Sequence, residues 1–599
     1  MADPIYTSPY PAVPLPRHSI FTHLLGVDPS SPGNVGGFPA SAPALIDSAT
    51  GTSLSRGSLR SYALQLAHSL LSPPAPLRRP NASSSPATLL IFSPNTLTWP
   101  IMLLGAAAAG YRATLANSAY TYTELAHQYV DSRAHLIFVH PSLVGVVRAM
   151  LESLGCTEAE IQRRIVVAGA TWLTKATNEE VGDGSPQELK GLLPITSLLS
   201  RGELQSEVPF SGSDADATVY MCYSSGTTGK PKGVETTHYN ITSVIEILKP
   251  VFPPLIPASA SPSHRSDVFF GVLPYYHIYG AIKLLQFPLA LGVPTVIMSK
   301  FDPGRFCSAV ERYRATVAFV VPPILVVFAR DEAITKYDIS SLKYLMSGAA
   351  PLGAELVATV TKRLASVGAN VAISQGYGLT ETSPTIFFLP VEHAARVGST
   401  GVLLPNLEVR LVSEEDGEEV SSAGMEGAGE LWVRGPTIMK GYLGNPSATA
   451  ASITPDGWFK TGDIVVRDKD GFYTIVDRRK ELIKYKGFQV PPAELESVLL
   501  QHPDVADAAV IGVESKEEAT ELPRAYIVPA SPSYNTPEFA RSVQGWVAER
   551  VAPHKRLRGG VVLIDVVPKS AAGKILRREL RERAKQEAGV GQMIPRVKL

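Results

Sequence analysis

Short runs of apolar and β-branched residues alternate with longer, helix-like segments through the first three-quarters of the chain. Runs of this length are typical of buried strands, and strands that alternate with helices favour parallel sheets. The pattern therefore predicts an α/β fold in which helices cover parallel sheets. The expected strands are Thr88–Phe92, His135–Val139, Arg164–Ala168, Val219–Tyr223, Val268–Leu273, Val293–Met298, Thr316–Val321 and Lys343–Met346.

Polar stretches rich in proline, serine and glycine interrupt this alternation and predict surface loops. They are Pro73–Pro86, Asn178–Asp216 and Pro253–Asp267. Two apolar runs, Trp99–Ala109 and Leu284–Met298, are both shorter than the ~20 residues that a membrane-spanning helix needs. We therefore interpret them as buried core elements and expect no membrane span.

The pattern changes after Asp477. Pro491–Glu496 has the proline and acidic residues of a helix start, and Val505–Val513 and Ala525–Val528 are strand-like. From Ile575 onward the chain is charged and helix-like. A boundary near Lys480 is predicted, with a large domain at 1–479 and a small α+β domain at 480–599.

Composition narrows the possible functions. The chain has 599 residues, 45% of them hydrophobic, with a formal net charge of zero. This balance, without a basic stripe, argues against a nucleic-acid partner. The cysteines Cys156, Cys222 and Cys307 are too few and too scattered for a disulfide framework or a metal cage, which favours a reducing, intracellular compartment. The last three residues, Val597-Lys598-Leu599, end like a peroxisomal signal, so cytoplasmic and peroxisomal locations both stay open.

The segment from Tyr223 to Gly233 (YSSGTTGKPKG) is rich in groups that bind polyphosphate. Glycines let backbone N–H groups approach an anion, hydroxyls donate hydrogen bonds, and lysines neutralise charge. It is not a Walker A loop, because Pro231 follows Lys230 where serine or threonine is required. Taken alone, the segment could also be an ordinary turn, although phosphate binding is the favoured interpretation.

Further motifs follow it in order along the chain. They are Tyr276–Gly280 (YHIYG), Gln375–Glu381 (QGYGLTE), Thr461–Asp463 (TGD), Asp477–Gln489 (DRRKELIKYKGFQ) and Pro568–Ile575 (PKSAAGKI). Together with the glycine-rich segment, these motifs resemble the adenylate-forming superfamily, and within it the 4-coumarate–CoA ligase branch, from Leu89 to Glu579. The resemblance implies an N-terminal domain that includes a small β-subdomain, and a mobile C-terminal lid.

The implied activity is that of an ATP-dependent carboxylic acid–CoA ligase. A carboxylate attacks ATP to give an acyl-adenylate, and the thiol of coenzyme A then attacks that intermediate, with Mg²⁺ as the metal ion. The acid could be aryl, hydroxycinnamate-like, medium-chain aliphatic or polyketide-derived. Alternatives are an enzyme that loads a carrier protein and a luciferase-like oxygenase. A scaffold protein without activity is disfavoured, because the motif residues are intact.

The resemblance also assigns the nucleotide site. The glycine-rich segment and Lys232 would hold the β- and γ-phosphates, Thr380 would bond the α-phosphate, and Glu381 would hold Mg²⁺. Gln375, Gly376 and Tyr377 would contact the nucleotide, with Tyr377 stacked on the adenine, and Asp463 and Arg478 would lie at the ribose. The residues expected from the glycine-rich segment are Ser224, Ser225, Gly226, Thr227 and Thr228.

The C-terminal lid would carry the catalytic cation Lys574 and would rotate about Lys480 between the two steps. Lys484 and Gln489 align with nucleotide-contacting positions. After the rotation the lid would present Lys486 and Gly487 to coenzyme A, and Lys300 aligns with a position that contacts coenzyme A. His277 aligns with a histidine that lies beside the acyl carboxylate.

The acyl pocket implied by the resemblance contains Ile278, Tyr279, Lys283, Gly348, Ala349, Gly376 and Pro384. Lys283 departs from the family pattern, which has a small or polar residue at this position. Two interpretations stay open. The ammonium of Lys283 could reach water while its stem covers apolar surface, or it could pair with a carboxylate or phenolate of the substrate.

Overall fold

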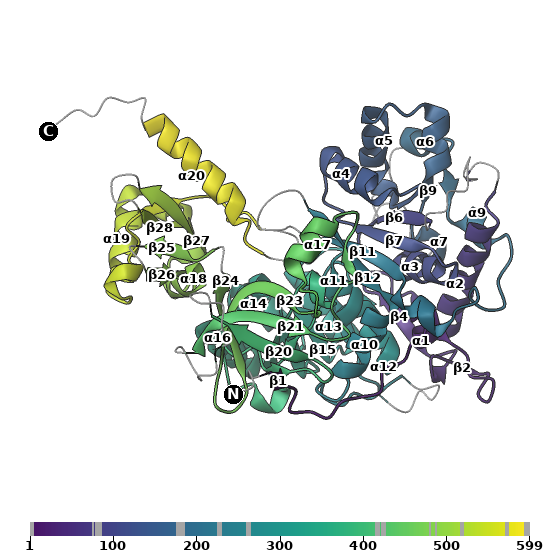
Figure 1. Ribbon diagram of the computed structural model, residues 1–599, viewed down its shortest axis with the longest axis horizontal. Coiled ribbons are helices and arrows are strands. Elements are labelled where there is room, and N and C mark those ends of the chain that lie inside the picture. Colours follow the sequence, from purple (N-terminus) through teal and green to yellow (C-terminus); the bar gives the residue numbers. More distant parts are fainter. Residues whose placement is uncertain are drawn as a thin grey trace.

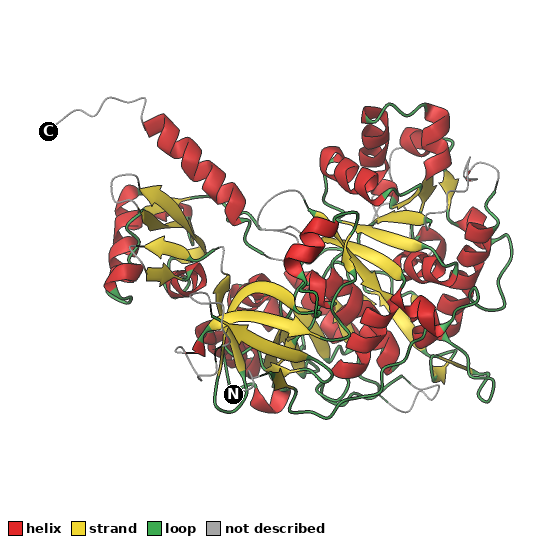
Figure 2. Ribbon diagram, in the orientation of Figure 1, coloured by secondary structure: helices red, strands yellow, loops and turns green. Residues whose placement is uncertain are grey.

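The computed structural model describes residues 5–74, 77, 87–174, 186–224, 231–258, 265–350, 352–413, 420, 427–478, 481–485, 488–515, 520–569 and 574–591. Figure 1 shows a large body that contains the N-terminal three-quarters of the chain, and a smaller unit that the last part of the chain forms beside it. Helices and strands are mixed throughout the large body (Figure 2).

A first sheet has the order β10-β9-β8-β6-β7-β11-β12-β22. Its strands run parallel from β10 to β11, and β12 and β22 join antiparallel. The strands are β6 (Thr88–Phe92), β7 (Arg112–Ala116), β8 (Leu136–Val139), β9 (Ile165–Val167), β10 (Leu193–Pro194), β11 (Thr218–Ser224), β12 (Lys232–Thr237) and β22 (Gly441–Tyr442). The glycine-rich segment therefore joins the neighbouring strands β11 and β12.

A second sheet has the order β19-β18-β17-β16-β15-β13-β14-β4-β5, parallel from β17 to β4 and antiparallel at both edges. Its strands are β4 (Pro43–Asp47), β5 (Ser53–Ser55), β13 (Phe269–Gly271), β14 (Thr295–Ile297), β15 (Val317–Val320), β16 (Tyr344–Ser347), β17 (Ala372–Tyr377), β18 (Phe387–Phe388) and β19 (Val402–Leu403). The carboxyl ends of parallel strands are a usual place for a ligand site in such sheets.

Helices connect the strands of these two sheets. Helix α3, which lies between β6 and β7 in the chain, is buried along its whole length, so the run Trp99–Ala109 is a core helix. The main helices are α1 (Ile20–Leu25), α2 (Arg56–Leu71), α3 (Thr98–Ala108), α4 (Tyr122–Ser132), α5 (Val144–Ser153), α6 (Glu158–Arg164), α10 (His238–Leu248), α13 (Pro303–Tyr313), α14 (Pro322–Arg330) and α16 (Ala354–Ser366). No helix among the described residues has the length and apolar character to cross a membrane.

An antiparallel sheet, β1-β20-β21-β23-β24, forms the expected β-subdomain. Its strands are β1 (Tyr6–Thr7), β20 (Glu408–Val412), β21 (Gly429–Arg434), β23 (Phe459–Arg467) and β24 (Tyr473–Arg478). The motif Thr461–Asp463 lies within β23, and Asp463 pairs in register with Arg478 of β24. Two motifs that are distant in sequence therefore meet across one strand pair.

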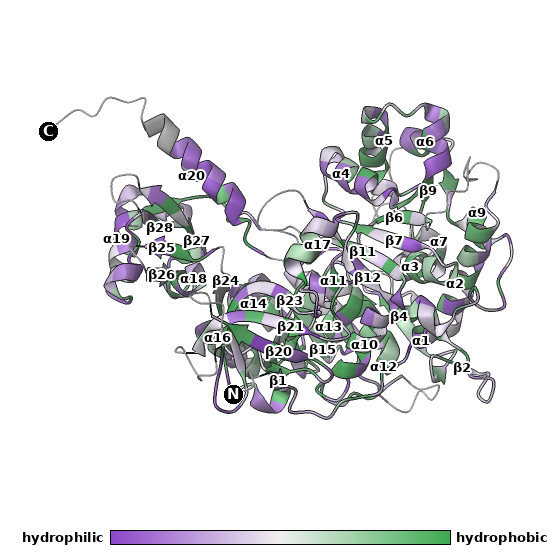
Figure 3. Ribbon diagram, viewed as in Figure 1, coloured by the Kyte–Doolittle hydropathy of each residue, from purple (hydrophilic) through white to green (hydrophobic). Residues whose placement is uncertain are grey.

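The C-terminal unit is α+β, as expected. Strands β27 and β28 are antiparallel, β29 joins β28 in parallel, and β25 pairs with β26. Its elements are β25 (Ile483–Tyr485), β26 (Phe488–Val490), α18 (Pro492–Leu499), β27 (Val505–Ser515), β28 (Thr520–Pro529), α19 (Pro537–Ala548), β29 (Val561–Leu563) and α20 (Arg577–Gly591). Hydrophilic residues dominate α20 (Figure 3), in agreement with the charged pattern of the sequence.

The prediction of Asn178–Asp216 as one loop is wrong for its described part. That part contains α8 (Pro186–Leu189), β10, α9 (Thr196–Leu199) and the 3-10 turn Gly212–Asp216. These elements are too short to show a periodicity in sequence, and β10 is stabilised by its partner β9. Most of the predicted loop Pro73–Pro86 lies outside the described residues.

Candidate active site

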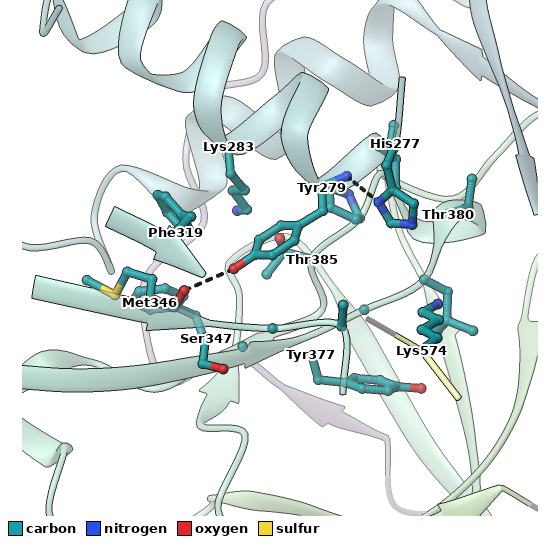
Figure 4. A pocket seen from close by; sticks show the side chains of 18 residues that line it. His277, Tyr279, Lys283, Phe319, Met346, Ser347, Tyr377, Thr380, Thr385 and Lys574 are labelled. Atoms are coloured by element: carbon teal, nitrogen blue, oxygen red, sulfur yellow. Dashed lines mark hydrogen bonds between the residues drawn. The ribbon is translucent and has the colours of Figure 1, made fainter. Parts of the chain in front are cut away.

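A cavity opens at the carboxyl ends of β16 and β17, and several predicted motifs converge on it (Figure 4). One wall comes from α11 (Ile278–Gly280) and the π-helical turn Ala281–Gln286 that follows. The lining residues are His277, Ile278, Tyr279, Lys283, Phe319, Met346, Ser347, Gly348, Ala349, Gly376, Tyr377, Gly378, Leu379, Thr380, Pro384, Thr385, Phe388 and Lys574. This list contains every acyl-pocket residue that the sequence predicted.

The turn after β17 needs glycine at one position. A Cβ atom on Gly378 would lie 1.4 Å from the carbonyl oxygen of Pro384, a clash that no local adjustment relieves. The absence of a side chain therefore lets the chain fold back on itself between Tyr377 and the 3-10 turn Thr380–Thr382. This turn places Thr380 in the cavity wall and Glu381 beside the end of β11.

Glu381 is almost fully buried and is held by two hydroxyl groups. Its Oε1 accepts hydrogen bonds from Ser224 Oγ at 2.9 Å and from the hydroxyl of Tyr442 at 3.0 Å. The ammonium of Lys232 lies over the Tyr442 ring, 4.6 Å from its centre. A carboxylate, a hydroxyl and a cation thus gather at the two ends of the glycine-rich segment. The carboxylate and hydroxyl are hard oxygen ligands of the kind that Mg²⁺ prefers, and the ammonium suits phosphate.

The other expected members of this group lie outside the described residues: Ser225, Gly226, Thr227 and Thr228. The same holds for the expected hinge Lys480 and for Lys486 and Gly487, as well as for the side chains of Arg478 and Gln489.

Tyr377 connects the second sheet to the β-subdomain. Its hydroxyl donates a hydrogen bond to Asp463 Oδ2, and its ring stacks on Phe387 with a centre distance of 5.8 Å. Asp463 is buried, so this contact fixes the carboxylate at the edge of the site. Gln375 lies two residues earlier on β17, in register with Ser347 of β16.

His277 has a defined protonation state. Its Nδ1 accepts the backbone N–H of Tyr279 at 3.2 Å, so the proton of the neutral ring is on Nε2. Burial, and then the positive charge of Lys574, lower the pKa of His277 to about 3. At neutral pH the ring is therefore uncharged, and it can donate a hydrogen bond from Nε2 into the cavity.

Lys574 comes from the C-terminal unit, yet it lines the same cavity as the residues of the large domain. Figure 4 shows it on the same side of the cavity as His277, Tyr377 and Thr380. The structure therefore brings together a cation from one domain and a neutral donor from the other.

The acyl wall is mainly aromatic and apolar. Tyr279 contacts the Phe319 ring edge to face at 5.8 Å, and its hydroxyl donates to the carbonyl of Met346 at 3.1 Å. Phe319, Met346, Ser347, Thr385 and Phe388 line the wall but were not singled out from the sequence. The sequence contained one indication of these wall residues, because Phe319 and Met346 lie near the carboxyl ends of predicted strands.

Lys283 does not reach water, which overturns one of the two interpretations of this residue. Its relative exposure is 2%. In the part of the chain that the structure describes, its Nζ has no hydrogen-bond partner. Burial lowers the pKa of its ammonium to about 7. The reason is geometric, since the π-helical turn directs the side chain toward the sheet and away from the surface (Figure 4).

Lys300 and Lys484 are also absent from the residues that line this cavity. Lys300 lines a separate hollow of about 360 Å³, together with Asn95, Ser118, Tyr276 and Lys569. Lys484 is exposed on β25. Both are outside the group formed around Lys574.

Comparisons with known proteins agree with this architecture. The model of the AMP-binding enzyme family matches residues 34–443, and that of the AMP-binding enzyme C-terminal domain matches residues 494–574. A probable 4-coumarate–CoA ligase 1 from Dictyostelium discoideum is 35% identical over 82% of this chain and 85% of its own length. A probable CoA ligase, CCL5, from Humulus lupulus is 36% identical over 82% of each chain.

The fold is also similar to that of solved structures with lower sequence identity. The crystal structure of ATP-bound MatB from Rhodopseudomonas palustris superposes with a TM-score of 0.76 at 24% identity, and the match covers 95% of this chain and 99% of that one. At this identity the likeness shows the fold alone. Together with the family models and the curated relatives, it shows that the chain belongs to the AMP-binding enzyme family of adenylate-forming ligases, among relatives of the 4-coumarate–CoA ligases.

Proposed function

We propose that this acid–CoA ligase activates its acid in the cavity described above, with ATP bound between Tyr377, Glu381 and Asp463. The observation that supports the proposal is that Lys574, His277 and Thr380 line the same side of an aromatic-walled cavity (Figure 4). The acid would lie in the cavity with its carboxylate at this end.

In the first step two anions must approach each other, the carboxylate and the α-phosphate. Lys574 would neutralise both, and the hydroxyl of Thr380 would donate to the phosphate. Neutral His277 would donate its Nε2 proton in a hydrogen bond to the carboxylate. A charged imidazole would be repelled by Lys574, so the lowered pKa of His277 suits this role.

The phosphates beyond the α-position would be held by Ser224, Lys232 and the residues between them. Glu381 would hold Mg²⁺, which would supply further neutralisation of phosphate charge. The fit rests on the buried carboxylate of Glu381 beside two hydroxyl groups. The ring of Tyr377 would pack on the adenine, and Asp463 would accept hydrogen bonds from the ribose hydroxyls.

The second step needs a different face of the C-terminal domain. We propose that residues 480–599 form a lid that rotates about Lys480 and exchanges Lys574 for Lys486 and Gly487. Coenzyme A would then use the hollow beside Lys300. Replacing Lys480 by proline should slow thioester formation and spare AMP formation, as single-turnover assays of each step would show. Equal loss of both steps would argue against this hinge.

The substrate class is supported by the cavity wall. Tyr279, Phe319 and Phe388 present rings to a narrow space, which suits a flat aryl or hydroxycinnamate-like acid. Relatives that are named 4-coumarate–CoA ligases support the same substrate class. Medium-chain aliphatic and polyketide-derived acids are the alternatives.

The test is Mg²⁺- and ATP-dependent AMP release over a panel of aryl and aliphatic acids, with and without coenzyme A. An acyl-CoA product with aryl acids is expected. Pyrophosphate exchange without a thioester would instead favour a carrier-protein loader.

The terminal residues Val597-Lys598-Leu599 lie outside the described residues. A fluorescent fusion with and without them would test whether they direct the chain to peroxisomes.

A further inference from the structure

Lys283 is the feature of the cavity that the two-step reaction leaves unused. It follows Tyr279 along the same helical segment, and its amine points into the space between Phe319, Tyr279 and Thr385 (Figure 4). Its Nζ lies 5.8 Å from the centre of the Phe287 ring.

A buried amine without a partner is unfavourable. Desolvation alone accounts for the lowered pKa of Lys283, and no charged neighbour compensates for it within the described residues. The other titratable groups of the cavity are His277, Tyr279, Tyr377 and Lys574. None of them is an anion at neutral pH, so the protein itself offers no counter-charge at this point.

The position of Lys283 decides which part of a bound acid it can meet. It lies on the other side of Tyr279 from His277 and Lys574 (Figure 4). The reacting carboxylate would lie at His277 and Lys574. Lys283 therefore faces the end of a bound acid that is remote from the reacting carboxylate.

Lys283 is one of the residues that line the cavity, and its Nζ has no hydrogen-bond partner among the described residues. An acidic oxygen at the end of a bound acid would supply that partner. An apolar end would instead seal the amine away from any acceptor, which is costly for a buried donor.

We propose that Lys283 determines specificity by binding an acidic oxygen group, either a second carboxylate or a phenol, at the end of the acid remote from the activated carboxylate. This inference rests on the proposed function, because it requires the acyl group to occupy this cavity. With a carboxylate, the amine would be held as ammonium in an ion pair. With a phenol, it would share the phenolic proton in a hydrogen bond.

The experiment compares acids of one shape that differ at the remote end. Cinnamate, 4-hydroxycinnamate and 4-carboxycinnamate are assayed for AMP formation with the wild type and with Lys283→Met, which keeps the length of the side chain but removes the charge. Wild type is expected to favour one acidic member over cinnamate by roughly 10- to 100-fold in kcat/KM, the range of a hydrogen bond to a charged group. A preference for 4-carboxycinnamate would show that Lys283 binds a carboxylate, and a preference for 4-hydroxycinnamate would show that it binds a phenol. Lys283→Met should abolish or reverse the preference, and Lys283→Arg should retain part of it.

A binding measurement separates recognition from catalysis. The sulfamoyl adenosine analogues of the same acyl-adenylates are titrated calorimetrically into both proteins, and the same order of affinities is expected. An identical preference in wild type and Lys283→Met, in either assay, overturns the inference while leaving the proposed function intact. Absence of AMP formation with every acid in both proteins overturns the proposed function, and the inference with it.

Discussion

At the scale of single residues, the site depends on how burial sets charge. His277 is held neutral by burial and by Lys574, and its Nδ1 is occupied by the backbone of Tyr279. One ring nitrogen is therefore held by the backbone, and the other is left for the cavity that His277 lines. A general base at this position would need a free ring nitrogen, so the geometry favours a hydrogen-bond donor.

Replacing Lys574 by methionine removes the cation that the two reacting anions would share. We expect AMP formation to fall by roughly 100- to 1000-fold, the loss typical of a missing electrostatic stabiliser. Thioester formation from a supplied acyl-adenylate should change little, because the second step would not use Lys574. Rapid-quench assays of the two steps check this. A comparable loss in both would indicate a general structural role instead.

Replacing Lys283 by methionine should stabilise the fold in a pH-dependent way. Its pKa is lowered from 10.5 to about 7 by burial, and at about 1.4 kcal/mol per tenfold change this corresponds to roughly 5 kcal/mol of unfavourable burial. Between pH 7 and 10.5 the unfolded chain binds this proton and the folded chain does not, so wild-type stability rises with pH.

The gain from Lys283→Met should therefore be largest below pH 7 and should vanish toward pH 10.5. Denaturant titrations of both proteins across this range measure it. A gain that is constant with pH would mean that packing, and not charge, separates the two proteins.

At the scale of elements, the ends of strands position the chemistry. The turn after β17 places Glu381 against residues from β11 and β22, so a single carboxylate depends on strands from both large sheets. The π-helical turn Ala281–Gln286 has a comparable effect on the opposite wall, where it directs Lys283 inward. Turns of this type are often found at functional sites.

Glu381→Gln keeps the shape of this side chain but removes its charge. We expect the Mg²⁺ concentration for half-maximal AMP formation to rise at least roughly tenfold, because Mg²⁺ prefers carboxylate ligands. Tyr442→Phe is the matched control, since it removes one hydrogen bond to Glu381 and leaves the charge. Mg²⁺ titrations of the wild type and both variants measure this concentration. An equal rise in both variants would refute Glu381 as a ligand.

At the scale of the whole molecule, the position of Lys574 depends on how its segment is held. Before it, Lys569 Nζ contacts both oxygens of Asp507 at 2.6 and 2.8 Å. After it, Arg577 donates to both oxygens of Glu496 at 2.7 Å and to Glu481 at 2.7 Å. These contacts fix both ends of the segment to the C-terminal domain. Movement of that domain as a unit would therefore carry Lys574 with it.

Arg577→Met should leave buried Glu496 without its cation. Breaking a buried ion pair in this way costs about 3–5 kcal/mol, so the C-terminal domain should unfold at lower denaturant. Arg583→Met is the matched control on the same helix. Its side chain is 50% exposed in a pair with Glu587, and such a surface pair is worth at most about 1 kcal/mol. Limited proteolysis and denaturant titrations of both variants measure the stability of the C-terminal domain. Equal stability of the two variants would contradict this account of Glu496.

Much of this arrangement could be predicted from the sequence. The predicted runs Thr88–Phe92 and Val505–Val513 are strands, because a buried strand requires a continuous apolar run that appears directly in sequence. The resemblance likewise pointed to Lys574, Glu381 and Tyr377, whose surroundings only the structure shows. The short elements within Asn178–Asp216 could not be found, since neighbours in space stabilise them.

The sequence by itself determined the family, the order of the domains and the residue types that could carry adenylation, because these depend on local patterns and motifs. Only the tertiary structure decided which of them meet. The pairing of Tyr377 with Asp463, the neutral state of His277 and the burial of Lys283 all depend on desolvation and on contacts between distant segments. A single position in sequence says nothing about what will exclude water from it, and for this reason Lys283 could be interpreted only once the cavity around it was known.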